Sequence, residues 1–200
     1  MNLIDTHCHL AHPRLAASLD DVLARARQAG VTAFVCAAGN VQDSRAALAI
    51  ARREANVYCL AGVHPHDAKD AGADDLAELE RLLGEPKTVA LGEAGLDYHY
   101  NFSPPEDQRR VFAEQLALAR RLGRHVVVHT REAFGDTLAI LRDSGLAGAD
   151  VLFHSCTEPP ENVRAILDFG ATVSYSGIVT FANADRKSTR LNSSHSELSR

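Results

Sequence analysis

The sequence lacks the segments that mark membrane and secreted proteins. None of its apolar runs approaches the roughly 18 residues of a membrane span, and residues 1–10 lack the charged start and long apolar centre of a signal peptide. We therefore expect a cytoplasmic protein without a membrane attachment. Since 46% of its 200 residues are hydrophobic, the chain is long enough to form one sizeable core that buries about 70% of the surface of the unfolded chain.

The cysteines lack the spacing of a zinc ribbon or a redox pair. The four of them lie far apart, inside apolar stretches, and no Cys-x-x-Cys pattern occurs. They are Cys8, Cys36, Cys59 and Cys156. We interpret them as small, reduced residues of the core.

Positive charge is also scarce. The net charge is −5, and no cluster of lysine and arginine occurs before the last sixteen residues. A nucleic-acid substrate would therefore have to be held by metal ions and a local groove, because the chain offers no broad basic surface. No obligate protein partner is evident from the sequence.

Apolar stretches typical of buried strands alternate with patterns typical of helices. The expected strands span residues 3–10, 32–37, 57–63, 88–92, 125–129, 150–154 and 171–176. The expected helices span residues 13–29, 42–55, 74–84, 104–122, 132–144 and 159–169. This alternation indicates an α/β protein with a parallel sheet that is covered by helices.

Two architectures fit seven such strands. A closed barrel takes eight strands and typically about 250 residues, so the pattern is one unit short. A doubly wound open sheet is the alternative, but its glycine-rich phosphate turn after the first strand is missing. We predict a TIM-type (β/α) barrel that is truncated after the seventh strand.

The last sixteen residues break the alternation. Residues 185–200 contain five serines, no aromatic residue, and only Leu191 and Leu198 as sizeable apolar groups. Such a segment cannot cover a sheet. We expect residues 1–184 to form the incomplete barrel, without its eighth strand. Residues 185–200 are expected to be a disordered, non-native tail, such as vector or adapter read-through joined to a truncated gene.

Side chains typical of metal ligands fall at the ends of the expected strands. These residues are His7, His9, Glu93, His129 and His154. Taken singly, each has a plainer explanation: Glu93 could form an ion pair, His129 could cap the following helix, and His154 could be a hydrogen-bonded core histidine. His7 and His9 could be two unrelated histidines at a strand end. The carboxyl ends of parallel strands share one rim, however, and barrel enzymes place their active sites there. Five ligands exceed the three that a catalytic zinc normally takes, so two metals that share Glu93 fit better.

Four segments resemble the signatures of the TatD family of metal-dependent hydrolases, in the amidohydrolase superfamily. They are IDTHCHL at residues 4–10, AGVHPH at 61–66, LGEAGLDY at 91–98 and SGIVTF at 176–181. The resemblance extends over residues 1–184. It implies two divalent metal ions, zinc, manganese or magnesium, and a deoxyribonuclease activity, notably that of a 3′-to-5′ exonuclease.

The resemblance also implies roles for individual residues. It assigns His7 and His9 to one metal, His129 and His154 to the other, and the catalytic Glu93 to both. It places His64 and His66 on the substrate side, although a strand-end turn at Pro65 would equally account for this pair.

One signature of the family is missing. Its last strand carries a Glu-Thr-Asp-x-Pro-like motif whose aspartate binds the first metal and orients or deprotonates the attacking water. Neither Asp185 nor Glu197 lies in an apolar strand that could supply this motif. We therefore expect an incomplete first metal site and unpaired edges at the first and seventh strands.

The predicted reaction is divalent-metal-dependent hydrolysis of phosphodiester bonds in DNA that is bound at the metal site. One alternative is an amidohydrolase acting on amide, lactone or phosphotriester bonds. Such enzymes often bridge their metals with a modified lysine on the fourth strand, where this chain has Glu93. The other alternative is a metal-binding fragment without turnover.

Overall fold

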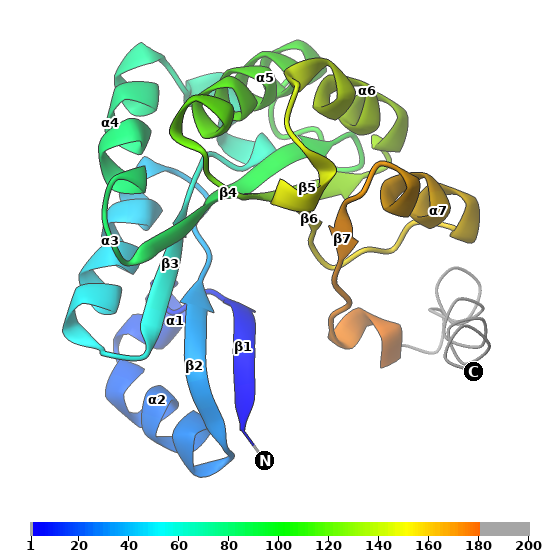
Figure 1. Ribbon diagram of the computed structural model, residues 1–200. Coiled ribbons are helices and arrows are strands. Elements are labelled where there is room, and N and C mark those ends of the chain that lie inside the picture. Colours follow the sequence, from blue (N-terminus) through cyan, green and yellow to red (C-terminus); the bar gives the residue numbers. More distant parts are fainter. Residues whose placement is uncertain (1, 181–200) are drawn as a thin grey trace.

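The strands form one curved parallel sheet with helices along its outer side (Figure 1). The computed structural model describes residues 2–180. Within this range the seven strands are hydrogen-bonded in chain order, from β1 (Leu3–Cys8) to β7 (Thr172–Val173), and all neighbours are parallel. The predicted α/β fold of the TIM-barrel type is thereby confirmed. The proposed tail at 185–200 lies outside the described residues.

The elements follow the predicted alternation closely. The inner strands are β2 (Val31–Cys36), β3 (Val57–Ala61), β4 (Thr88–Asp97), β5 (Val126–Arg131) and β6 (Val151–Phe153). The helices are α1 (Pro13–Ala16), α2 (Leu19–Gln28), α3 (Val41–Arg53), α4 (Ala73–Leu83), α5 (Pro105–Leu122), α6 (Phe134–Ser144) and α7 (Pro160–Asp168). Among the helices of residues 2–180, none is long and apolar enough to cross a membrane.

Short helical turns account for most differences from the prediction. The helix expected at residues 13–29 is divided between α1 and α2. Residues 2–180 also contain three 3₁₀ turns, of which the one at Pro65 coincides with the strand-end turn considered above and the other two were not indicated by the sequence. The three turns are η1 (Pro65–Asp70), η2 (Gly148–Asp150) and η3 (Gly177–Thr180). In η1, Pro65 occupies the first turn, and the side chain of His64 accepts a hydrogen bond from the backbone N–H of His66. Proline and a capping side chain together start a helical turn.

The core has two parts, one on each side of the sheet. Val126 and Val128 belong to the large cluster between the sheet and the helices, whereas Val127 joins a small cluster on the other face. This division follows the alternation of side chains along a strand. All four cysteines are free. Cys36, Cys59 and Cys156 are buried, as expected of core residues, whereas Cys8 is only partly buried and packs against the large cluster.

Strand β4 is longer than predicted, and it is distorted at its centre. It continues to Asp97, and its pairing with β5 shifts register between Leu91 and Ala94. Gly92 and Gly95 both have a φ of +149°, which side chains rarely tolerate. A Cβ atom at Gly95 would lie 1.9 Å from the carbonyl oxygen of His129. The sequence predicted that Glu93 ends the strand, which is wrong. Glu93 lies within a bulge of β4 that directs its side chain into a cavity.

We predict that Gly95→Ala lowers the free energy of unfolding by roughly 1–3 kcal/mol, because the added methyl group would collide with the backbone of β5. Gly135→Ala, in α6, is the matched control, since a Cβ there meets nothing within 4 Å. Denaturant unfolding of both variants measures the difference. Equal stability of the two variants would contradict this account of β4.

Candidate metal centre

The predicted site residues line one cavity of about 990 Å³ at the carboxyl ends of the strands. They are His7, His9, His64, His66, Glu93, His129 and His154. Of these, His7, Glu93 and His129 lie within β1, β4 and β5, and His154 directly follows β6. Parallel strands thus bring together side chains that are far apart in the sequence.

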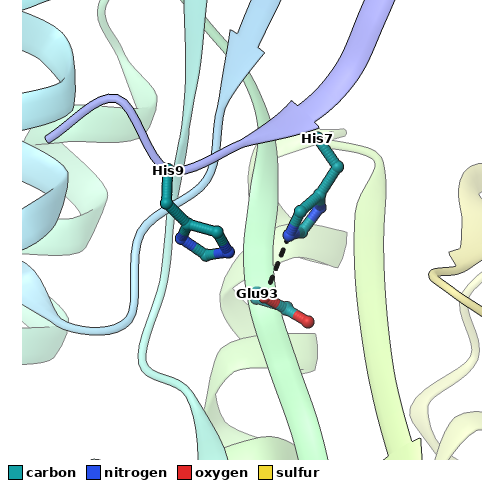
Figure 2. A group of neighbouring side chains, drawn as sticks. All are labelled: His7, His9 and Glu93. Carbon is teal, nitrogen blue, oxygen red and sulfur yellow. Dashed lines mark ion pairs between the residues drawn. The ribbon is translucent and has the colours of Figure 1, made fainter. Parts of the chain in front are cut away.

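The first group of possible ligands consists of His7, His9 and Glu93 (Figure 2). One ligand atom of each residue lies within 4.8 Å of the others. His7 Nε2 is 3.2 Å from Glu93 Oε2, and the rings of His7 and His9 lie 5.1 Å apart, measured between their centroids. Figure 2 shows both rings directed towards the carboxylate from the end of β1.

The second group consists of His64, Glu93 and His129, again with ligand atoms within 4.8 Å of one another. His129 Nδ1 lies 3.3 Å from Glu93 Oε1. Glu93 therefore belongs to both groups, with one oxygen towards each. The ring of His154, the predicted partner of His129, stacks on that of His7 at 3.5 Å between centroids. Its role as a metal ligand stays a prediction. His64, which was assigned to the substrate, occupies the position next to His129.

The donor atoms suit a divalent cation. Imidazole nitrogens and a carboxylate are typical ligands of zinc and are shared by other transition metals. The side chain of Glu93 is only 7% exposed, and an ionised carboxylate at such a place needs a compensating charge. Among the described residues, His7 Nδ1 is a buried polar atom without a hydrogen-bond partner. Both features are expected of a site that is completed by a cation.

Glu93 and several histidines of the cavity have shifted pKa values. Burial alone would raise the pKa of Glu93, but hydrogen bonds from His129 and His7 outweigh it and hold this pKa well below its usual value. Burial would lower the pKa of His129, whereas its contacts with Glu93 and Asp97 raise it overall. Burial and neighbouring imidazoles lower the pKa of His64 to about 3 and that of His154 to about 4. His64 and His154 are thus neutral at pH 7, as metal ligands must be.

Asp97 lies in the LGEAGLDY segment, but no role for it was predicted from the sequence. Its side chain is fully buried, and Oδ2 lies 3.0 Å from both His66 Nε2 and His129 Nε2. Because Nδ1 of His129 faces Glu93, Asp97 holds the opposite nitrogen of the same ring. Such a carboxylate orients a ligating histidine and selects its tautomer. Asp97 and Glu93 are separated by an even number of positions, so the alternation of side chains places both on the same face of β4. This spacing could have indicated a role for Asp97 in the site.

A parallel barrel sheet that carries histidines and a shared carboxylate at the carboxyl ends of its strands is typical of metal-dependent hydrolases. The sequence model of the TatD related DNase family matches residues 4–198. The chain therefore belongs to this family, as its four sequence segments indicated.

Similar proteins agree with this assignment. The uncharacterized metal-dependent hydrolase YcfH of Escherichia coli K12 is 38% identical over 189 residues, which are 93% of this chain and 71% of YcfH. The 3′-5′ ssDNA/RNA exonuclease TatD of Edwardsiella piscicida is 37% identical over 178 residues, 88% of this chain and 68% of that protein. The crystal structure of YjjV, a TatD homologue from E. coli K12, superposes on this chain with a TM-score of 0.85. The matched region covers 91% of this chain and 71% of YjjV, and the two sequences are 28% identical.

We predict that Asp97→Asn weakens metal binding about 10- to 100-fold, because an amide no longer fixes the tautomer of His129 as a carboxylate does. The measurement is calorimetric titration with Mn²⁺. Glu132→Gln is the matched control: it also removes one negative charge from the cavity wall, but Glu132 pairs with the exposed His99. Unchanged affinity in Asp97→Asn would show that Asp97 does not orient the ligand.

We also predict that metal affinity falls as the pH is lowered, and that the fall begins above pH 6.5. The pKa of His129 is raised above its ordinary value of 6.5, so this ring takes up a proton at a higher pH than His9, His64 and His154, whose pKa values are lowered. A protonated imidazole cannot bind a metal, and the cation must displace that proton. Titrations with Mn²⁺ between pH 6 and pH 8 test this order. Affinity that is constant over that range would contradict it.

Proposed function

We propose that this chain is a divalent-metal-dependent phosphodiesterase that removes nucleotides from the 3′ end of single-stranded DNA. The observation that carries the proposal is the placement of Glu93 between two groups of histidines in one cavity. Membership of the TatD related DNase family and the name of the E. piscicida relative support the choice of substrate.

The charges around the cavity support a reaction that depends on cations. Acidic side chains line it, including Asp43, Asp67 and Glu158, whereas Arg131 is its single lysine or arginine among the described residues. Without added positive charge, this wall would repel a phosphodiester. Bound divalent cations would supply that charge, polarise the phosphate and lower the pKa of a water molecule.

The residues of the chain hold this arrangement in place. Nitrogens of His7 and His129 lie 3.2 Å and 3.3 Å from the two oxygens of Glu93, where they favour its ionised form. Asp97 holds His129 from the other side, so its Nδ1 remains directed at Glu93. The depressed pKa values of His64 and His154 keep their lone pairs available. The site is thus prepared to bind two cations without a rearrangement of the strands.

We propose two cations, one at His7, His9 and Glu93 and one at Glu93 and His129. His64 lies closest to completing the second position, and His154 was the ligand predicted from the sequence. A donor set rich in imidazole favours zinc or manganese, and magnesium with additional waters is the third option.

Three predictions from the sequence stay predictions. The incompleteness of the first metal site concerns residues beyond 180. The other two are the cytoplasmic location and the lack of an obligate protein partner.

The proposal predicts shortening of a 5′-labelled single-stranded oligonucleotide from its 3′ end. EDTA should stop the reaction, and added Mn²⁺ should restore it. We expect Glu93→Gln to lower kcat by roughly 100-fold or more, since it removes the charge shared by both groups. Glu132→Gln, on the same cavity wall, should retain most of the activity.

Two results would favour the alternatives. Two metals per chain in elemental analysis, without shortening of DNA, would indicate a metal-binding protein without turnover. Intact DNA together with hydrolysis of an amide, lactone or phosphotriester would indicate another amidohydrolase activity.

A further inference from the structure

An exposed pair of aromatic rings lies in the loop between β4 and α5. Tyr100 and Phe102, called the aromatic platform below, are 47% and 57% exposed. Their rings are stacked, with centroids 5.4 Å apart and planes inclined by 21°. Single exposed apolar residues are common, but two stacked rings on a loop form a surface that is suited to a flat partner.

The loop that carries the platform is held at both ends by buried polar groups. Asp97 Oδ1 accepts hydrogen bonds from the backbone N–H groups of His99 and Tyr100. Ser103 is fully buried, donates to the carbonyl oxygen of His66 and accepts from the N–H of Lys69. The two rings are thus presented in a preorganised position, which lowers the entropic cost of binding.

The platform adjoins the candidate metal centre through His66. The ring centroid of His66 lies 4.8 Å from that of Phe102 and 5.6 Å from that of Tyr100. His66 also lines the cavity, and it shares Asp97 Oδ2 with His129. A polymeric substrate bound at the metal centre can therefore extend directly onto the rings of Tyr100 and Phe102.

A positive charge accompanies the rings. The guanidinium of Arg131 lies 4.7 Å from the ring centroid of Tyr100, and Arg131 lines the cavity. The neighbouring Glu132 is instead paired with His99, at 2.8 Å. Stacked aromatic rings beside a cation are the usual combination in proteins that bind single-stranded nucleic acids.

We infer that the aromatic platform stacks the bases of a single-stranded nucleic acid whose 3′ end lies at the metal centre, with Arg131 beside its backbone. This inference rests on the proposed function, and it names the feature of the substrate that the site recognises. Stacking uses the face that every base possesses, so the site should tolerate any base sequence while requiring unpaired bases. Continuity with the cavity favours this occupant over an apolar protein segment.

The test compares two 5′-labelled oligonucleotides of equal length. One carries normal bases throughout, and the other has tetrahydrofuran abasic residues at its three 3′-terminal positions. Fluorescence anisotropy gives Kd, and shortening gives kcat/KM. We expect the unmodified chain to prefer the base-bearing oligonucleotide at least about 10-fold. The double variant Tyr100→Ala/Phe102→Ala should lose this preference and bind the abasic oligonucleotide as before.

Two further variants serve as controls. Tyr100→Phe retains the ring and should retain the preference. Tyr58 is also exposed and lies 4.7 Å beneath the Lys87 ammonium, but it lies in β3 away from the cavity lining, so Tyr58→Ala should leave the preference intact. An equal loss on both oligonucleotides in the double variant would indicate structural damage and would overturn the stacking role.

The outcomes separate this inference from the proposed function. A preference for bases in Kd, without cleavage, supports the platform and contradicts the nuclease proposal. Cleavage without a preference for bases supports the nuclease and overturns the platform. Failure to bind either oligonucleotide overturns both.

Discussion

The buried carboxylate of Glu93 is the constraint on which the rest of the site depends. An ionised group in a nearly closed position is costly unless opposite charge or strong donors surround it. Two histidines supply the donors from different strands, one to each oxygen. The bulge of β4 makes this possible, because Gly92 and Gly95 allow the strand to approach β5 closely while Glu93 is directed into the cavity.

From Glu93 the arrangement continues outwards through a single chain of contacts. His129 joins Glu93 to Asp97, and Asp97 joins His129 to His66. Asp97 also anchors the loop that carries the two exposed aromatic rings. One buried aspartate thus couples the orientation of a possible metal ligand to the position of a surface suited to nucleic-acid bases. Polar networks of this kind rigidify a site when every member is satisfied.

Much of this arrangement could be anticipated from the order of residues. Alternating apolar strands and amphipathic helices predicted the parallel sheet, and the short motifs indicated the TatD family, which the comparisons confirm. The position of Glu93 was predicted less well, because a strand that bulges and continues to Asp97 cannot be distinguished by pattern from one that ends at Gly92. That His64 lies beside His129 and Glu93 depends on ring orientation, which local sequence does not encode.

The sequence by itself determined the class of the fold, the kinds of side chain available and the strand ends at which they occur. It did so because hydrophobic periodicity and motif spacing are local properties of a chain. Only the tertiary structure decided which imidazoles share Glu93, that Asp97 lies behind His129, and that Tyr100 and Phe102 stack beside His66. These relations join residues from different strands and loops, and they depend on strand register, backbone bulges and rotamers that packing alone selects.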